Sequence, residues 1–296
     1  MVMVKLKLDA LILGGGGLLG DAFAQALGPA AKSVGRAALN PADPAALLHL
    51  VKSSSASTII NCAAHTDVDG AESDSAAAYR VNALLPQLLA AACHRYGKRL
   101  IHFSSTGCYG RWKDEAYTEF DPVEPTTVHH KSKVAGEVAV RSLTPTHLII
   151  RTGWLFGGAP SNPKNFVWRR LLEAHRTRRL ISDPYQSGCP TYVNDLVAQV
   201  RSMMGLELCG TFNVVSQGAA SRLDYVKKIV ESAGLACIVE ASDAPFPRRA
   251  AVSNNETAVN QALGMLGMDQ MPGWEDAVGR YAKELLISSE WKKFEA

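Results

Sequence analysis

Near its beginning, the chain carries glycines at a spacing that suits phosphate binding. Gly14, Gly17 and Gly20 lie in the stretch Leu-Ile-Leu-Gly-Gly-Gly-Gly-Leu-Leu-Gly, residues 11–20. Such glycines permit a tight turn, let backbone N–H groups approach a pyrophosphate, and allow the next helix to pack closely. An apolar run precedes the turn and a helical pattern follows it. The sequence therefore predicts a dinucleotide cradle rather than a flexible glycine linker.

A second group of polar residues combines hydroxyls with basic side chains. Ser104, Ser105 and Thr106 follow an expected strand, and the carboxyl ends of parallel strands face the ligand crevice. His129 and Lys133 are four residues apart, so they share one face of the helix expected there. The sequence therefore places these hydroxyl and basic side chains at the end of a strand and at the start of a helix.

Arg36 ends the second expected strand, where the ribose of an adenosine would lie. An acid there suits a ribose 2′-hydroxyl, whereas an arginine can bind a 2′-phosphate. The sequence therefore favours NADP(H) over NAD(H), with a solvated surface arginine as the alternative.

The composition is that of an ordinary globular protein. The 296 residues are 47% hydrophobic and 20% charged, with a formal net charge of +3. That charge is too small to suggest nucleic acid, and no run is long enough to span a membrane. The six cysteines are not closely paired, and the acids Asp67, Asp69 and Glu72 lack the later ligands of a calcium loop. We expect reduced thiols, a cytoplasmic protein and no metal site.

Strand and helix patterns alternate along the first half of the chain and become less regular in the second. The expected strands cover residues 32–36, 57–62, 98–104, 146–151 and 212–215. The expected helices cover residues 21–27, 44–52, 75–96, a segment from 129, 165–175, 194–204, 221–233 and 274–286, before a frayed tail at 288–296. The alternation predicts an α/β fold with a Rossmann-type doubly wound parallel sheet.

The lobes are expected to be interleaved, because no low-complexity linker separates them. Residues 1–160 should form mainly the NAD(P)-binding domain, with about 185–215 returning to it. Residues 161–296 should form mainly a smaller substrate-binding lobe.

Further motifs run along nearly the whole chain. They are residues 61–72 with Val81-Asn82, Ser132-Lys133 through Glu137, 151–157, 165–166, 183–191 and 248–254. With the glycine turn and the serine strand, this series resembles the extended short-chain dehydrogenase/reductase superfamily, most closely the dTDP-4-dehydrorhamnose reductase family. The resemblance implies hydride transfer to a keto group on a nucleotide-activated deoxysugar or a related natural-product sugar.

The resemblance also implies a reacting centre of Ser or Thr, Tyr and Lys. Ser105 matches the hydroxyl that binds the carbonyl, and Lys133 matches the lysine that holds the nicotinamide ribose and lowers the tyrosine pKa. The tyrosine should lie four residues before that lysine, where this chain has His129. A histidine with a pKa of about 6.5 can donate a proton, but its ring is shorter than a phenol and the lysine cation depresses its pKa. Catalysis could survive, slow or be lost.

Other sites follow from the same resemblance. The residues implied in cofactor binding are Gly14, Gly17, Leu18, Leu19, Gly20, Arg36, Asn61, Ala63, Ala64, Asn82 and Lys133. Those implied in substrate binding are Thr66, Val68, Thr106, Trp154 as a sugar-stacking ring, Asn165 and Arg248. After the catalytic hydroxyl the family usually has Asp and Tyr, and this chain has Thr106 and Gly107, which should open the pocket and change the substrate. Tyr109 is a weaker candidate for a replacement acid.

Other functions stay open. The His129 replacement and the Thr106-Gly107 pair also suit an NADP-binding regulatory or structural subunit without reductase activity. The regulatory subunit of methionine adenosyltransferase, which resembles the same family, has such a role. A redox-neutral epimerase or cyclase is a third alternative. The expected partner is a nucleotide-sugar or another glycosyl small molecule, and a homodimer is left open.

Overall fold

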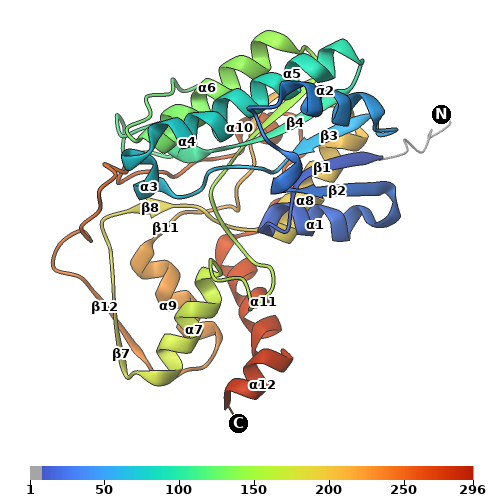
Figure 1. Ribbon diagram of the computed structural model, residues 1–296. Helices are drawn as coiled ribbons and strands as arrows, with labels where there is room; N and C mark the ends of the chain where they lie inside the picture. Colours follow the sequence, from blue (N-terminus) through green and yellow to red (C-terminus); the bar gives the residue numbers. More distant parts are fainter. Residues whose placement is uncertain (1–8, 296) are drawn as a thin grey trace.

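The computed structural model describes residues 9–295, and its centre is a six-stranded parallel sheet (Figure 1). The strand order is β2-β1-β3-β4-β5-β10, with every pairing parallel. The strands are β1 (Ala10–Gly15), β2 (Ala31–Gly35), β3 (Thr58–Asn61), β4 (Arg99–Ser105), β5 (His147–Thr152) and β10 (Gly210–Asn213). The predicted Rossmann-type sheet is confirmed.

Helices cover both faces of this sheet. One face carries α2 (Pro44–Ser53), α5 (Leu85–Arg95) and α6 (Val128–Leu143), and the other carries α1 (Leu18–Leu27) and α8 (Val193–Gly205) (Figure 1). Successive side chains of a strand point to opposite faces. Leu11 and Leu13 of β1 accordingly belong to the hydrophobic core under α2, α5 and α6. Ile12 belongs to the core on the opposite face, under α1 and α8. Because both faces are buried, the strands read as nearly continuous apolar runs.

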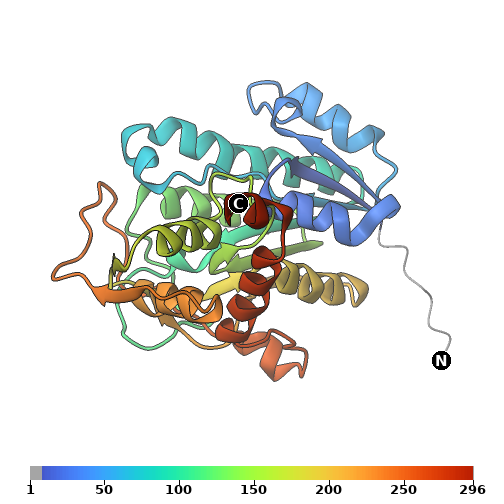
Figure 2. The same ribbon diagram turned by 90° about the horizontal axis from the view of Figure 1, so that it is seen from below.

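A smaller group of elements lies below the sheet in Figure 1. It contains α7 (Phe166–Arg176), α9 (Arg222–Ser232), α11 (Trp274–Leu286), α12 (Ser289–Glu295) and the parallel pair β7 (Arg179–Ser182) and β12 (Ile238–Ala241). Figure 2 shows the same group from below. Two short pairings connect its segments, β6 (Trp154–Phe156) with β9 (Pro190–Tyr192), and β8 (Ser187–Gly188) with β11 (Ala220–Ser221).

Short helical segments complete the structure. They are α3 (Val68–Ser73), α4 (Ser75–Tyr79), α10 (Gln261–Met265), the π-helical turn η3 (Arg80–Leu84), and the 3₁₀ turns η1 (Gly28–Ala30), η2 (Arg36–Ala38) and η4 (Thr106–Cys108). No helix within residues 9–295 is both long and apolar enough to cross a membrane.

The single helix expected over 75–96 is wrong in one respect, because η3 interrupts it between α4 and α5. Pro86 lies in the first turn of α5. Proline has no N–H to donate to the carbonyl of Asn82, four residues earlier, so regular α-helical bonding fails at that point. The wider π turn accommodates the gap and includes Asn82 itself.

The frayed tail expected at the end of the chain is also wrong for the described residues. The segment forms α12, and Trp291 within it is only 2% exposed. The Trp291 ring lies 5.9 Å from the Trp168 ring and 5.5 Å from the His175 ring, centroid to centroid. Burial of such a large aromatic surface orders the helix. Ala296, the last residue of the expected tail, lies outside the described residues.

Candidate active site

The candidate site lies at the carboxyl ends of β1, β3 and β4. Because β1 pairs with β2 on one side and with β3 on the other, the chain reverses its direction of progress across the sheet here. Loops diverge at such a switch point and leave a crevice that binds ligands. The glycine turn follows β1, and Ser105 ends β4.

The glycine turn makes contacts that only glycine permits. A Cβ on Gly14 would lie 2.8 Å from the backbone nitrogen of Ala63, and one on Gly20 would lie 2.4 Å from the carbonyl oxygen of Gly14. Gly17 is the N-cap of α1, and no side chain of the described residues caps this helix. The first N–H groups of α1, which include those of Leu18 and Leu19, therefore suit an anion. These features fit the pyrophosphate of a dinucleotide.

Arg36 lies beside this turn. Gly35 at the end of β2 pairs with Gly15 at the end of β1, and Arg36 follows directly as the first residue of η2. Its side chain is exposed, and none of the ion pairs found within residues 9–295 uses it. The guanidinium is thus available to a phosphate near the glycine turn.

Two asparagine amides hold the loop after β3 in place. Asn61 Oδ1 accepts a hydrogen bond from the N–H of Ala63 at 3.2 Å. Asn82 Oδ1 accepts from the N–H of His65 at 2.9 Å, and its Nδ2 donates to Ser132 Oγ at 3.0 Å. Both asparagines are buried. They shape the loop that contains Ala63 and Ala64, whose half-buried backbone borders the glycine turn.

Lys133 extends from α6 toward the end of β4. Its Nζ donates to the carbonyl oxygen of Phe103 at 2.8 Å, the one acceptor it reaches within the described part of the chain. Burial lowers the pKa of Lys133 to about 8, and Glu137 opposes that shift. An ammonium can donate three hydrogen bonds. The remaining donors of this buried group fit a ligand with hydroxyl groups, such as a ribose.

Ser105 contacts His130, to which the sequence analysis assigned no role. Ser105 Oγ lies 3.4 Å from Nε2 of His130 and accepts from the N–H of Gly107 at 3.2 Å. The other ring nitrogen of His130, Nδ1, lies 3.1 Å from Oγ1 of Thr127, the N-cap of α6. Glu256 places Oε1 4.0 Å from Nε2. The opening expected at Gly107 is not found, because the His130 ring fills the space beside it.

His129 lies next to this group without a hydrogen bond to Ser105. Its ring centroid is 5.0 Å from that of His130, and its buried Nδ1 has no hydrogen-bond partner among the described residues. Burial, with the nearby His130 and Lys133, lowers the pKa of His129 to about 3. The structure thus brings His130, rather than His129, to Ser105.

Tyr109 is unsuited to act as a replacement acid. It is fully buried, its hydroxyl donates to Asn213 Oδ1 at 2.7 Å, and Arg151 Nη1 donates to that hydroxyl at 3.1 Å. Burial raises the pKa of Tyr109. Thr106, the first residue of η4 and an expected substrate contact, is 2% exposed.

Trp154 belongs to the same polar network as Glu256. Its Nε1 donates to Glu256 Oε2 at 2.7 Å, and the guanidinium carbon of Arg222 lies 3.3 Å from the ring centroid. Gly188 allows this packing, because a Cβ there would lie 2.4 Å from the ring. Arg222 therefore already stacks on the ring that was expected to stack on a sugar.

Two of the other expected substrate contacts are occupied by protein partners. Asn165 caps α7 by accepting from the N–H of Trp168 at 3.1 Å, and its Nδ2 donates to the hydroxyl of Tyr281 at 2.6 Å. Thr66 Oγ1 accepts from Lys164 Nζ at 2.8 Å. Asn165 is therefore committed to a helix end, whereas Thr66 is exposed at the surface.

Arg248 lies in the irregular segment that follows β12 and contacts α3. Its Nη2 lies 3.2 Å from Oδ2 of Asp69 in α3, the helix that begins at Val68. The N–H of Ala250 and the guanidinium of Arg248 hold the pKa of Asp69 below its ordinary value. Asp67, another of the three acids compared with a calcium loop, caps α3 by accepting from Gly70 N–H at 2.9 Å. Residues 9–295 contain no cluster of three or more His, Cys, Asp and Glu side chains able to hold a metal ion.

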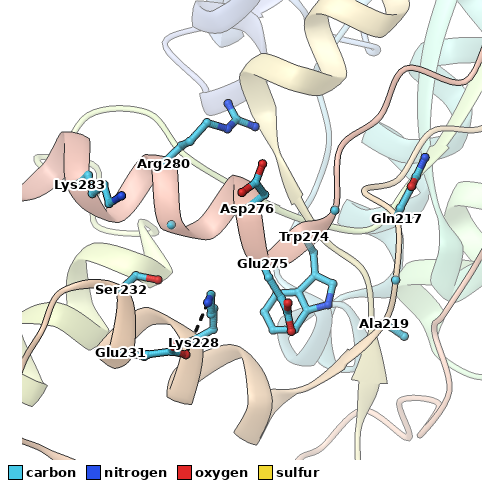
Figure 3. Close-up of a pocket in the computed structure, with 13 residues that line it drawn as sticks. Gln217, Ala219, Lys228, Glu231, Ser232, Trp274, Glu275, Asp276, Arg280 and Lys283 are labelled. Carbon is cyan, nitrogen blue, oxygen red and sulfur yellow. Dashed lines mark hydrogen bonds and ion pairs between the residues drawn. The ribbon is translucent and has the colours of Figure 1, made fainter.

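A separate hollow lies between α9 and α11. It has a volume of about 800 Å³ and is lined by charged side chains and by Trp274 (Figure 3). Lys228 and Glu231 on its α9 wall lie 3.5 Å apart and pair with each other. None of the residues implicated in cofactor or substrate binding lines it.

The chain also matches a known protein family. The family described as the RmlD substrate binding domain matches residues 8–287, which include the glycine turn, Ser105 and Lys133. The chain belongs to this family.

Several known proteins are similar to this chain. dTDP-4-dehydrorhamnose reductase of Mycobacterium tuberculosis is 35% identical over 243 residues, covering 80% of this chain and 79% of that protein. Spore coat polysaccharide biosynthesis protein SpsK of Bacillus subtilis is 28% identical over 280 residues, or 93% and 96% of the two chains. The crystal structure of dTDP-4-dehydrorhamnose reductase from Bacillus anthracis in complex with NADP has a TM-score of 0.89 at 29% identity, covering 94% of this chain and 100% of that one.

Proposed function

We propose that the protein is an NADP(H)-dependent reductase of a keto group on a nucleotide-activated deoxysugar or a related sugar. The observation that carries this proposal is the meeting of the glycine turn, Lys133 and Ser105 at one end of the parallel sheet. Membership of the RmlD family and the activity named for its relatives support it. The proposed substrate class, a sugar, rests on the names of those relatives and not on a feature of this chain.

The residues present fit a nicotinamide dinucleotide. When bound, that cofactor supplies the hydride. Gly14, Gly17 and Gly20 let the pyrophosphate approach the N-terminus of α1, and Lys133 offers its unused donors to a ribose. Arg36 is exposed beside the turn, which favours the 2′-phosphate of NADP(H) over the hydroxyl of NAD(H).

On the substrate side, the hydroxyl of Ser105 binds the carbonyl oxygen. His129 occupies the position of the family's tyrosine, beside Lys133 on the same helix. Arg248, which bridges the lobes through Asp69, is 32% exposed at its side chain and can exchange that carboxylate for a ligand phosphate.

The test is a spectroscopic assay of NADPH oxidation against a panel of 4-keto nucleotide sugars. We expect turnover with at least one of them, identified by product analysis. Lys133→Ala and Ser105→Ala should each reduce turnover, whereas Lys131→Ala, an exposed site on the same helix, should not. NADPH binding without reduction of any keto sugar would overturn the reductase assignment.

The state of His129 favours a second candidate, an NADP-binding regulatory or structural subunit. A pKa near 3 leaves this histidine neutral at physiological pH, so it is a poor proton donor. The second candidate expects tight NADPH binding, no turnover by the native protein, and a stable protein partner in pull-down experiments.

A further inference from the structure

His130 is the centre of a buried polar cluster that joins α6 to the segment around residue 256. It is 4% exposed, and Glu256 is 6% exposed. Its ring lies within reach of Thr127, Ser105 and Glu256. Buried polar groups are usually satisfied by fixed partners, and in this cluster each partner can exchange a proton with the next.

The neighbours of His130 offer a partner to each ring nitrogen. Thr127 Oγ1, which accepts from the backbone N–H of His130 at 3.1 Å, also lies 3.1 Å from Nδ1 and has a second lone pair that can accept a hydrogen bond from it. Glu256 lies on the Nε2 side at 4.0 Å and favours a hydrogen there. The protonated imidazole therefore has partners for both of its N–H groups, with Nε2–H facing Ser105.

That arrangement aims the hydroxyl of Ser105 away from the histidine. Ser105 Oγ accepts from Gly107 N–H at 3.2 Å and can also accept from Nε2 of His130 at 3.4 Å. With its lone pairs engaged, the hydroxyl hydrogen of Ser105 is left for a third partner. A substrate carbonyl oxygen is a suitable one.

Resting on the proposed reductase function, we propose that His130 is the proton source behind Ser105. A bound nicotinamide cofactor would supply the hydride to the carbonyl carbon, and the carbonyl oxygen would then need a proton. The Ser105 hydroxyl passes its proton to that oxygen, and Nε2 of the His130 imidazolium passes its proton to Ser105 Oγ. The carbonyl becomes an alcohol, His130 is left neutral with its remaining proton on Nδ1, and a proton from solvent restores the imidazolium between turnovers.

The charges around the two histidines favour His130 over His129 in this role. Burial lowers the pKa of His130 below its ordinary value, with Lys133 and Arg248 acting in the same direction, and the Glu256 carboxylate opposes that shift. For His129, burial with the nearby His130 and Lys133 lowers the pKa to about 3, and no carboxylate among the described residues opposes it. Only His130 combines a carboxylate with contact to Ser105.

The proposal is tested by comparing His130→Gln with the matched variant His129→Gln. A glutamine keeps a donor near Ser105 but cannot titrate. At saturating substrate we expect His130→Gln to reduce kcat by about 100-fold or more with little change in KM, and His129→Gln to reduce kcat by a much smaller factor. In the native protein kcat should fall as pH rises through the lowered pKa of His130, on the acid side of neutrality, and His130→Gln should abolish that dependence.

Glu256→Gln keeps an acceptor for Trp154 but removes the charge near His130. We expect the pH at which kcat is half-maximal to move to lower values. Nitrogen-15 NMR titration of the histidine rings in the same variant should show a lower pKa for His130. In the native protein the spectra should show the neutral His130 ring protonated on Nδ1, toward Thr127 Oγ1.

Each outcome decides between the claims. Turnover that His130→Gln leaves unchanged, or a neutral His130 ring protonated on Nε2, would overturn the proton relay and leave the reductase assignment intact. Absence of turnover by the native protein with every keto sugar would overturn the reductase assignment, and the relay with it.

Discussion

The imidazole of His130 fills the space beside Gly107: a Cβ built on Gly107 would lie 2.2 Å from both Cε1 and Nε2 of that ring. The family resemblance implies a tyrosine at position 107, and no side chain there can coexist with His130 in its present place. The absence of a side chain at position 107 is therefore what allows the His130 ring to take its present place. It also explains why the pocket is not opened where the sequence analysis expected an opening.

A double-mutant cycle should reveal this packing relationship. The backbone of Gly107 suits any residue, so Gly107→Ala acts by sterics alone. Because its methyl group would contact His130 and Glu256, we expect a loss of about 1–3 kcal/mol in the free energy of unfolding. With His130→Ala, the same change should cost much less, and urea denaturation of the four proteins measures the coupling. Additive effects would contradict the pairing.

Much of the cofactor side can be predicted from sequence because its constraints are local. The turn at Gly14 and Gly20 lies between an apolar strand and a helix, and strand–helix alternation specifies a parallel sheet. The start of a helix can also be recognised in the sequence, because Asp and Ser are favoured as N-cap residues. Asp67 and Ser221 are the N-caps of α3 and α9.

The cluster around His130 could not be predicted in the same way. Glu256 lies in an irregular segment without periodicity, and it meets His130 and Trp154 only through the tertiary fold. The available signal was the adjacent pair His129-His130 together with the glycine at 107. The helix α12 was missed for a similar reason, since Trp291 is ordered by contacts with distant aromatic rings.

Gly20→Ala should impair both folding and dinucleotide binding. Its Cβ would lie 2.4 Å from the carbonyl oxygen of Gly14, a backbone atom that cannot rotate away. We expect a lower Tm and a large rise in the Kd for NADPH, measured by fluorescence titration. Gly264→Ala is the matched control, because a Cβ there meets no atom within 4 Å. Equal NADPH affinity in the two variants would contradict the assigned cradle.

Arg36→Ala should change cofactor preference without affecting the fold. A lost charge-assisted hydrogen bond to the 2′-phosphate costs about 1.5–3 kcal/mol, so we expect NADPH to bind roughly 10- to 100-fold more weakly. NADH affinity should hardly change. Arg201→Ala, at an exposed site on α8, controls for general loss of positive charge. An equal loss of affinity for NADPH and NADH in Arg36→Ala would argue against the 2′-phosphate contact.

NADPH affinity should fall as pH rises above about 8, the pKa of the buried Lys133. Below that pH the ammonium attracts the anionic cofactor, and above it the neutral amine does not. Lys133→Met should bind more weakly and lose this pH dependence, which titrations from neutral to alkaline pH would measure. An unchanged pH profile in Lys133→Met would mean that another group is responsible.

Acid should destabilise the protein through its buried histidines. Burial lowers the pKa of His102 to about 3 in the folded chain, and His129 has a similar value. In the unfolded chain their pKa is about 6.5, so the unfolded state takes up protons first. Their contribution to the free energy of unfolding is fully present above about pH 6.5 and declines toward pH 3, by up to about 1.4 kcal/mol per pH unit for each group.

Urea denaturation of native protein and His102→Gln across this pH range measures this effect. The free energy of unfolding should depend less steeply on pH in His102→Gln, while His49→Gln, at an exposed site, should match the native slope. Parallel slopes for native protein and His102→Gln would mean that protonation of His102 does not drive acid unfolding.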